Sequence, residues 1–368
     1  MFVAPRNILP EDPKFPSNLK DLGYQINEKD ELRSLEDPDQ PFKYRVNVND
    51  RYNEVRKEAI NECTRKTVLS RLKDLGLQTL RLPIGSTETT PHVPILITPS
   101  IFTSKRTIVV FGEPTQDLGI WAYRTIGSKT INAGSAVDFT KEVLRADKGQ
   151  DAPGLIIANL GQLVWYCRGQ KAVSLATWEA LPRESAVLPS YKITRRNIIP
   201  QNKSWGEHVS YVFSEVLDKM IPQTAKIDII GVAEGCIGTV DYLSENWSKW
   251  EHRISAICMA DPPTYMPYEC TSDVQDFLSK RSRAYMMSAK PTDTPIPGFA
   301  EFGVNCYSSG VNDFAECIVP NCYKSMLKWL DIMYAHPTLE EKPLITGDVE
   351  PLNDDDVKVE EFTDALGV

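Results

Sequence analysis

The segment that most constrains this fold is KIDIIGVAEGCIG, residues 226–238. Its apolar start predicts a short buried strand, and the residues after Gly235 follow the pattern of a helix. Between them, Gly231, Ala233 and Gly235 have the G-x-x-x-G spacing of a nucleophile elbow, the sharp strand-to-helix turn of α/β-hydrolases. The middle residue of an active elbow carries a reactive side chain, whereas here it is alanine. We therefore predict a hydrolase-like scaffold with a degenerate elbow and no catalytic residue.

The general base of a hydrolase triad also has no counterpart in this sequence. That base is a histidine in the loop after the last strand, oriented by an acid from an earlier loop. Asp261 and Asp293 stand where the acid is expected, but the last loop, residues 308–316, contains no histidine. The four histidines of the chain lie at other positions: His92, His208, His252 and His336.

Two alternatives to an inert scaffold remain open from the residues alone. The first is an esterase or thioesterase with a non-standard nucleophile, in which Cys236, Glu234 or Asp261 acts; a cysteine nucleophile still needs a base within reach. The second is a pocket that holds a small acyl or nucleotide ligand without reacting. The candidate pocket-lining residues lie in and around the elbow and in the loop that follows an earlier strand: Glu113, Gln116, Asp117, Glu234 and Cys236.

Strand and helix patterns alternate along most of the chain. Continuous apolar runs at 106–111, 154–159 and 254–260 predict strands that are covered on both faces, because a strand with one solvent face alternates instead. Helical patterns lie between them, as at 206–221. This order predicts an α/β-hydrolase-like fold, a doubly wound and mostly parallel sheet with helices on both faces, formed by a single domain over 18–336.

The two ends differ from this body. Residues 1–17 are rich in proline and predict a flexible arm. Residues 337–368 hold ten acidic and two basic residues, a net charge of −8 out of −9 for the whole chain, and predict a disordered acidic tail. The start of the chain lacks the apolar run of a signal peptide, and no stretch is long enough to span a membrane. We expect an intracellular protein without membrane contact.

Further expectations concern partners, cofactors and metals. The eight cysteines are scattered without the paired spacing of zinc sites, so we expect no metal and no cofactor. The insertion at 161–205 contains Trp165 and Trp178, which we take as aromatic anchors of a docking surface. Two basic clusters contain an aromatic residue each and are candidates for RNA or partner contact. Their cations are Lys192, Arg195 and Arg196 in one cluster, and Lys280, Arg281 and Arg283 in the other.

Several strings together resemble a known family. They are VVFGEPTQDLGIWAYRTIG at 109–127, INAGSAVDF at 131–139, and the segments LKDLGYQIN and ELRSLEDPDQPFKYRVNVNDRYNEVRKEAINEC within 19–63. The chain resembles the fungal argonaute-binding protein 2 (Arb2-type) domain family over roughly residues 18–336. That domain is also similar to one at the C terminus of fungal class II histone deacetylases.

The resemblance implies an α/β-hydrolase-like fold that is used for binding. Members of the family act in an argonaute siRNA chaperone complex with argonaute and a second argonaute-binding protein. The complex holds duplex siRNA and supports heterochromatin formation with histone H3 lysine 9 methylation. The resemblance therefore implies a place in the nucleus and cytoplasm, with siRNA reached through the complex and a link to histone-deacetylase-associated chromatin factors. Some relatives keep a serine at the elbow and a histidine in the last loop, where this chain has Ala233 and Asp313–Phe314.

Overall fold

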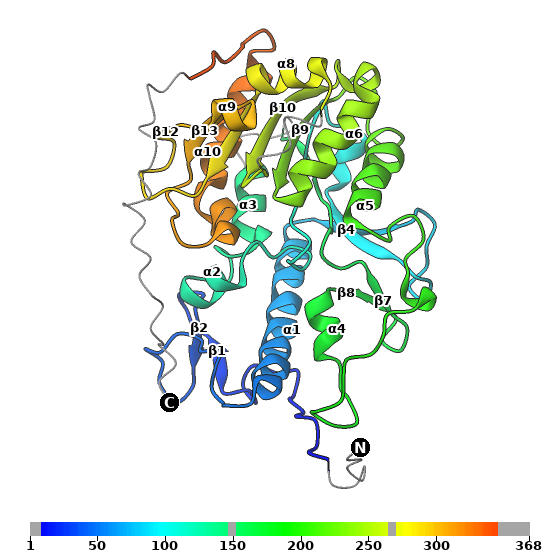
Figure 1. Ribbon diagram of the computed structural model, residues 1–368, viewed down its shortest axis with the longest axis vertical. Helices are drawn as coiled ribbons and strands as arrows, with labels where there is room; N and C mark the ends of the chain where they lie inside the picture. The colour runs from blue at the N-terminus through cyan, green and yellow to red at the C-terminus, as the bar shows by residue number, and fades with distance from the viewer. Residues whose placement is uncertain (1–8, 146–151, 264–269, 345–368) are drawn as a thin grey trace.

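A twisted sheet of nine strands forms the centre of the described structure (Figure 1). The computed structural model describes residues 9–145, 152–263 and 270–344. The strands lie in the order β12-β13-β11-β10-β9-β5-β6-β4-β3. Their bounds are β3 Gln78–Leu82, β4 Val93–Ile97, β5 Arg106–Phe111, β6 Gly154–Ile157, β9 Lys226–Val232, β10 Ile254–Ala260, β11 Ser282–Met286, β12 Pro295–Ile296 and β13 Asn305–Ser308.

The sheet is mostly parallel, as the alternation of strands and helices predicted. Strands β6, β5, β9, β10, β11 and β13 pair in parallel, while β3, β4 and β12 add antiparallel edges. Strand β4 was not predicted, because Pro94 interrupts its apolar run and proline is normally a signal against a paired strand. The predicted fold class is confirmed.

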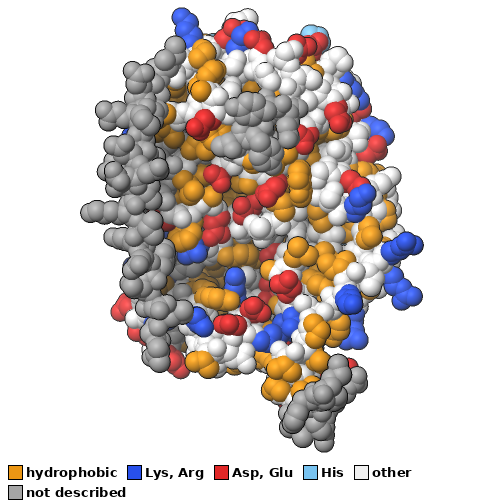
Figure 2. All heavy atoms as spheres, in the orientation of Figure 1, with side chains coloured by type: hydrophobic (Ala, Val, Ile, Leu, Met, Phe, Trp, Pro, Cys, Tyr) orange, Lys and Arg blue, Asp and Glu red, His pale blue; other side chains and the backbone are white. Residues whose placement is uncertain are grey.

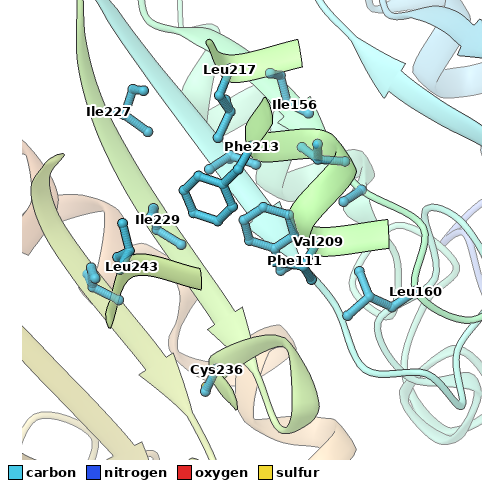
Figure 3. Packing of buried hydrophobic residues seen from close by; sticks show 14 of the residues in the cluster. Phe111, Ile156, Leu160, Val209, Phe213, Leu217, Ile227, Ile229, Cys236 and Leu243 are labelled. Carbon is cyan, nitrogen blue, oxygen red and sulfur yellow. The ribbon is translucent and has the colours of Figure 1, made fainter. Parts of the chain in front are cut away.

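Helices cover both faces of the sheet, so the inner strands bury side chains in two different cores. In β9, Ile227 and Ile229 face one core, whereas Ile230 and Val232 face the other. The first core receives α5 Trp205–Tyr211, α6 Glu234–Trp250 and α8 Ser272–Arg281; the second receives α1 Asp50–Asp74, α3 Ala136–Val143 and α10 Ile318–Ala335. Figure 3 shows Phe111 and Phe213 in the first core, where their rings stack with centroids 5.4 Å apart. A π-helix, η5 Val212–Leu217, follows α5 in the predicted helical region.

Part of α1 and several short elements lie beyond the end of the sheet where the parallel strands finish. An N-terminal hairpin pairs β1 Tyr24–Ile26 with β2 Leu32–Ser34, and α1 begins after Asn49, whose side chain caps it. The remaining described elements are α2 Tyr123–Ser128, β7 Val164–Tyr166, β8 Lys171–Val173, α4 Leu175–Ala180, α9 Phe299–Phe302 and the 3₁₀ turns η2 Pro99–Phe102, η4 Arg195–Asn197 and η6 Ala315–Cys317. In Figure 1, α1, α2 and α4 form a layer below the ends of β9 and β10.

The N-terminal arm is attached to the body from residue 10 onward, which corrects the predicted boundary at residue 17. Asp12 is buried and accepts two hydrogen bonds from Arg51, at 2.8 and 2.9 Å. The carbonyl of Pro10 accepts hydrogen bonds from the side chain of Ser185 and the backbone N–H of Ala186. A proline-rich composition concealed this attachment, because it depends on a buried ion pair and not on an apolar run.

The predicted acidic tail likewise begins later than residue 337. Glu341 accepts hydrogen bonds from Arg283 and from the indole N–H of Trp329, and its backbone N–H donates to the carbonyl of Lys280. Asn305 then binds the backbone on either side of Pro343, at the Lys342 carbonyl and the Leu344 N–H. The folded body therefore extends at least to residue 344, and the rest of the predicted tail lies outside the described residues.

We expect the substitution Glu341→Ala to lower the free energy of unfolding by about 2 kcal/mol, because it leaves the largely buried guanidinium of Arg283 without its carboxylate. Urea denaturation measures this change. Glu340→Ala is the matched control, since Glu340 is exposed and its only described ion pair, with Lys280, spans 3.9 Å. Equal stability of the two variants would contradict an anchoring role for Glu341.

Candidate functional site

The predicted elbow is present at the end of β9. The strand ends at Val232, α6 begins at Glu234, and Ala233 between them has φ 48° and ψ −116°. A positive φ is uncommon for a residue with a Cβ atom and persists only where the surrounding structure imposes it. The strained turn that presents a nucleophile in hydrolases is therefore retained here around a methyl group.

The two glycines of the elbow are required by close backbone approaches. A Cβ atom on Gly235 would lie 2.2 Å from the carbonyl oxygen of Phe111 in the neighbouring strand β5. A Cβ atom on Gly231 would lie 3.0 Å from the backbone nitrogen and Cα of Cys236. The G-x-x-x-G spacing thus reflects how tightly α6 packs against the ends of β5 and β9.

Cys236 belongs to the core and does not line a pocket, which corrects its assignment as a pocket residue. Its side chain is 1% exposed, and its thiol lies 3.9 Å from the carbonyl oxygen of Ala260 (Figure 3). Burial raises the pKa of this thiol far above its ordinary value. The thiolate, which is the reactive form, is therefore strongly disfavoured at this position.

The two candidate acids lie after β10 and β11. Asp261 follows β10 directly, with φ 52°. Asp293 accepts a hydrogen bond of 2.7 Å from the side chain of Ser325, which ties it to α10. In the last loop, where a hydrolase carries its histidine, Phe314 is covered by the guanidinium of Arg124 at 3.4 Å from the ring centroid.

The four histidines lie in other surroundings. His208 is fully buried and binds Asn159 and Asn202, whereas His92 binds the carbonyl of Thr90 and packs on Trp165. His252 precedes β10, at the edge of the sheet opposite the elbow, and His336 follows α10; both are exposed. Within the described parts of the chain, no histidine has a hydrogen bond or ion pair with an elbow residue.

Carboxylates gather where β5, β9 and β10 end. Glu113 accepts hydrogen bonds of 2.8 Å from the side chains of Thr115 and Gln116, and Gln116 also donates to Glu316 at 3.1 Å. Burial raises the pKa of Glu113, and the nearby charges of Glu316 and Glu234 raise it further. Figure 2 shows acidic side chains gathered in the middle of this face.

Asp261 belongs to the same group of carboxylates. Burial raises its pKa, and the charge of Glu234 adds to that effect. The structure therefore brings together Glu113, Gln116 and Glu234, three of the five predicted pocket residues. Within the described residues, no cluster of three side chains is arranged to hold a metal ion.

A cavity of about 770 Å³ opens beside this group of carboxylates, between α1, α2, α4 and the loop after β5. Gln116 and Asp117 line it, whereas Glu113 contacts it only through Gln116, from which it accepts a hydrogen bond of 2.8 Å. Gly161 keeps the loop in place, because a Cβ atom there would lie 1.7 Å from the carbonyl oxygen of Gln116. Ala233 and its neighbours Glu234 and Cys236 do not line this cavity.

A buried ionic network forms one wall of the cavity. Arg65 of α1 donates to Asp117 at 2.8 Å and to Glu58, and the hydroxyl of Tyr123 donates to Asp117 at 2.7 Å. Burial alone would lower the pKa of Arg65, but its contacts with Tyr123, Asp117 and Glu58 raise it above its ordinary value. Arg65 was not predicted as a site residue; its signal in the sequence is a cation three residues before Val68, on the apolar face of a helix.

The two basic clusters differ in their surroundings. Lys192, Arg195 and Arg196 are exposed, and in the described part of the chain their side chains have no acidic partner. Arg281 and Arg283 are bound within the fold, which corrects their assignment to RNA or partner contact, whereas Lys280 is partly exposed at the surface. Lys280 pairs with Asp276, Arg281 binds four backbone carbonyls, and Arg283 binds Glu341 and stacks on Tyr307 and Trp329.

The tryptophans of the 161–205 insertion are also internal. Trp165 is 3% exposed and Trp178 is 6% exposed, with the indole N–H of Trp178 bound to the carbonyl of Tyr191. Their proposed role as docking anchors is wrong. The exposed large apolar side chains of this insertion are instead Leu175, Val187, Tyr191, Ile193 and Ile198.

Comparison with known families and proteins adds the following. The family model of the Arb2 domain matches residues 15–292. The human cotranscriptional regulator ARB2A is 23% identical over 307 residues, which are 77% of this chain and 73% of that protein. Its homologue in Dictyostelium discoideum is 23% identical over 317 residues, 82% of this chain and 77% of that protein.

Solved structures with a similar course of the chain include a histone deacetylase from Saccharomyces cerevisiae, with 14% identity and a TM-score of 0.42 over 75% of this chain and 98% of that one. A fungal esterase from Rhizomucor miehei has 12% identity and a TM-score of 0.35 over 80% of this chain and 95% of that one. None of the described helices combines the length and the apolar character that a membrane crossing needs.

Proposed function

Because this chain belongs to the Arb2 domain family, we propose that it is a non-catalytic interaction subunit that regulates transcription or chromatin from within the nucleus. The curated relatives named as cotranscriptional regulators support this role. The observation that carries the non-catalytic part is the retained elbow with Ala233 at its tip. A methyl group cannot attack a carbonyl, and the thiol of Cys236 is buried.

The finer role that we propose is the one implied by the family resemblance. The protein would act with argonaute and a second argonaute-binding protein, in both nucleus and cytoplasm, in small-RNA-directed silencing and heterochromatin formation. Duplex siRNA would be reached through the complex. Histone-deacetylase-linked chromatin factors would be further partners of the protein. The exposed cations Lys192, Arg195 and Arg196 support a contact with RNA or an acidic partner, because they have no described partner within the chain.

Affinity purification of the tagged full-length protein from its own cells tests both the regulatory role and the finer role in silencing. Mass spectrometry of the purified material is expected to identify chromatin or transcription factors, and argonaute together with small RNAs if the finer role holds. The variant Arg195→Glu/Arg196→Glu should lower the recovery of RNA or partner, whereas Lys324→Glu/Lys328→Glu, which reverses two exposed cations on α10, should not. Recovery of regulatory proteins without argonaute and small RNAs would contradict only the silencing role.

The absence of catalysis needs its own test, because the alternative with an unusual nucleophile makes a different prediction. We expect no turnover of p-nitrophenyl esters or acyl thioesters above that of heat-denatured protein. Ala233→Ser should also remain inactive, because a serine at the elbow has no histidine to accept its proton. Turnover that Cys236→Ala, Glu234→Gln or Asp261→Asn abolishes would establish the hydrolase alternative instead.

A further inference from the structure

The insertion at residues 161–205 carries an excess of positive charge on an otherwise acidic chain. It holds seven basic and two acidic residues, a net charge of +5, whereas the whole chain carries −9. Three of the seven cations are paired with acids or carbonyl groups of the fold: Lys171, Arg183 and Lys203. The other four are exposed, and their side chains have no hydrogen bond or ion pair with any described residue: Arg168, Lys192, Arg195 and Arg196.

These four cations gather around the turn η4. The thiol of Cys167 donates to the carbonyl of Arg196 at 3.4 Å, so the next residue, Arg168, is held beside the turn. The side-chain amide of Asn197 donates to the carbonyl of Trp165 at 2.9 Å, which ties η4 to β7. Figure 2 shows Lys and Arg side chains at the lower right of the molecule, over the region of β7. We call the four cations together the η4 surface.

The segment that leads into η4 is exposed and lacks main-chain partners. Residues 189–194 run without a turn or bend, and Tyr191 and Ile193 are 52% and 46% exposed. Among the residues that the structure describes, none forms a hydrogen bond with the backbone N–H or C=O groups of Lys192 and Ile193. An extended segment with unpaired backbone groups is a template on which another strand can pair.

Several hydrogen bonds hold this segment in place. The indole N–H of Trp178 donates to the carbonyl of Tyr191, and the hydroxyl of Tyr191 donates to the carbonyl of Pro182, both at 2.8 Å. The backbone N–H of Thr194 donates to the side-chain oxygen of Asn197 at 2.9 Å. Because the segment is already ordered, a partner that binds it does not have to supply the free energy of ordering a loop.

We propose that this segment and the η4 surface together dock an extended acidic segment of a partner protein, in which carboxylates alternate with apolar side chains. The partner's backbone pairs with that of Lys192 and Ile193, with a carboxylate opposite Lys192 and an apolar side chain opposite Ile193. Further carboxylates face Arg195 and Arg196. This inference rests on the proposed role as an interaction subunit and adds the chemistry of the partner.

A peptide suits this surface better than a nucleic acid does. Two exposed apolar side chains beside the cations are isoleucines, Ile193 and Ile198, and an isoleucine has no ring on which a base can stack. A peptide backbone also supplies N–H and C=O groups with the spacing of a strand, which a sugar–phosphate backbone does not. Clustered cations fit either polyanion, so the isoleucines and the unpaired backbone decide between them.

Fluorescence anisotropy with the full-length protein tests this chemistry. The probe is a fluorescein-labelled peptide of eight residues in which glutamate and valine alternate. We expect it to bind at least about tenfold more tightly than three matched peptides, because each of them lacks one of the proposed interactions. In the first, lysine replaces glutamate; in the second, serine replaces valine; in the third, every backbone nitrogen is methylated, which removes the main-chain donors.

Single-stranded oligouridylate of the same net charge is the competing probe. Tighter binding of this RNA than of the Glu–Val peptide would assign the surface to nucleic acid and overturn the proposal. Equal binding of any of the three matched peptides would overturn it as well. So would the absence of saturable binding of the Glu–Val peptide with the protein at up to about 100 μM.

Charge reversal locates the binding surface. Arg195→Glu/Arg196→Glu is expected to weaken binding of the Glu–Val peptide at least about tenfold. Lys324→Glu/Lys328→Glu changes the net charge of the protein by the same amount on exposed positions of α10, and we expect it to change the affinity less than about twofold. All four side chains are exposed, so both proteins should fold. Equal affinities of the two variants would overturn the assignment of the surface.

A second pair of variants tests the apolar contact. Ile193→Ser is expected to weaken binding of the Glu–Val peptide about threefold or more, since it removes the side chain opposite a valine. Ile332→Ser is the matched control, because Ile332 is 40% exposed and lies on α10, whereas Ile193 is 46% exposed. An Ile193→Ser protein that binds the peptide as tightly as Ile332→Ser would contradict the pairing.

These binding measurements and the purification from cells can fail separately. Regulatory proteins recovered from cells, together with a Glu–Val peptide that does not bind, would overturn the docking surface and leave the regulatory role in place. A peptide that binds as expected, together with a purification free of regulatory proteins, would support the surface and contradict the role.

Discussion

Replacing Gly235 by alanine is expected to lower the free energy of unfolding by about 3 kcal/mol or more, although alanine is the better helix former. The added methyl group would lie 2.2 Å from the carbonyl oxygen of Phe111 and 2.9 Å from that of Gly112. Both neighbours are backbone atoms at the end of β5, so neither can turn aside as a flexible side chain would. The helix α6 must move away from the sheet, and the packing of Cys236 and Val240 in the first core moves with it.

Urea denaturation followed by tryptophan fluorescence measures this effect. Gly206→Ala in α5 is the control, because a Cβ atom at Gly206 meets no heavy atom within 4 Å, and we expect a change of at most about 1 kcal/mol in the stabilising direction. A Gly235→Ala protein as stable as Gly206→Ala would show that the elbow does not depend on a close contact between α6 and β5. The G-x-x-x-G spacing would then have no structural cause at Gly235.

The elbow could be predicted from the sequence because each part of it has a local signal. The apolar run that ends at Gly231 indicates a buried strand, the two glycines indicate a tight turn, and the pattern beyond Gly235 indicates a helix. Continuous apolar strands separated by helices also led to the doubly wound sheet and its two covered faces. Strand β4 was not predicted, because Pro94 argues against a paired strand, whereas β4 pairs antiparallel with a strand on each side.

The predictions that failed concern residues whose roles depend on distant partners. Arg281 and Arg283 have the composition of an RNA-binding cluster, but residues 333–341 supply three of the four carbonyls that bind Arg281 and the carboxylate that binds Arg283. Trp165 and Trp178 are aromatic residues in an insertion, and only the folded chain shows that Trp165 joins the first core while Trp178 packs with Val173 and Leu181. Composition alone does not show whether a cation or an aromatic ring is free to contact another molecule or is already bound within its own chain.

The candidate site could be predicted only in part, because its residues also come from distant segments of the chain. Gln116 and Asp117 were identified from the loop after a predicted strand, and the cavity contains both. The other side of the cavity comes from α1, more than fifty residues earlier in the chain, where Glu58 and Arg65 complete the ionic network. No local pattern links these two segments, so the position of the cavity beside the elbow, and its negative charge, become visible only in three dimensions.

The buried imidazole of His208 is expected to make the protein sensitive to acid. The backbone N–H of Asn159 can only donate, so Nε2 accepts its hydrogen bond at 3.1 Å, and Nδ1 carries the proton donated to Asn202 at 2.7 Å. Burial lowers the pKa of His208 from 6.5 to about 3. A folded-state pKa below the unfolded value means that stability is complete above pH 6.5 and is lost as the pH falls towards 3. Between pH 6.5 and 4, this residue alone should lower the free energy of unfolding by about 3 kcal/mol.

Urea denaturation at a series of pH values separates this contribution from that of the carboxylates. His208→Gln keeps one donor and one acceptor but does not titrate, so we expect it to be less stable than the unchanged protein at pH 7 and to lose less stability between pH 6.5 and 4. His252→Gln is the control, because the side chain of His252 is 88% exposed and should leave the pH profile unchanged. A His208→Gln profile as steep as that of the unchanged protein would assign the acid sensitivity to other groups. A shallower profile would identify His208 as a neutral structural histidine, held by Asn159 and Asn202 and unsuited to act as a general base at neutral pH.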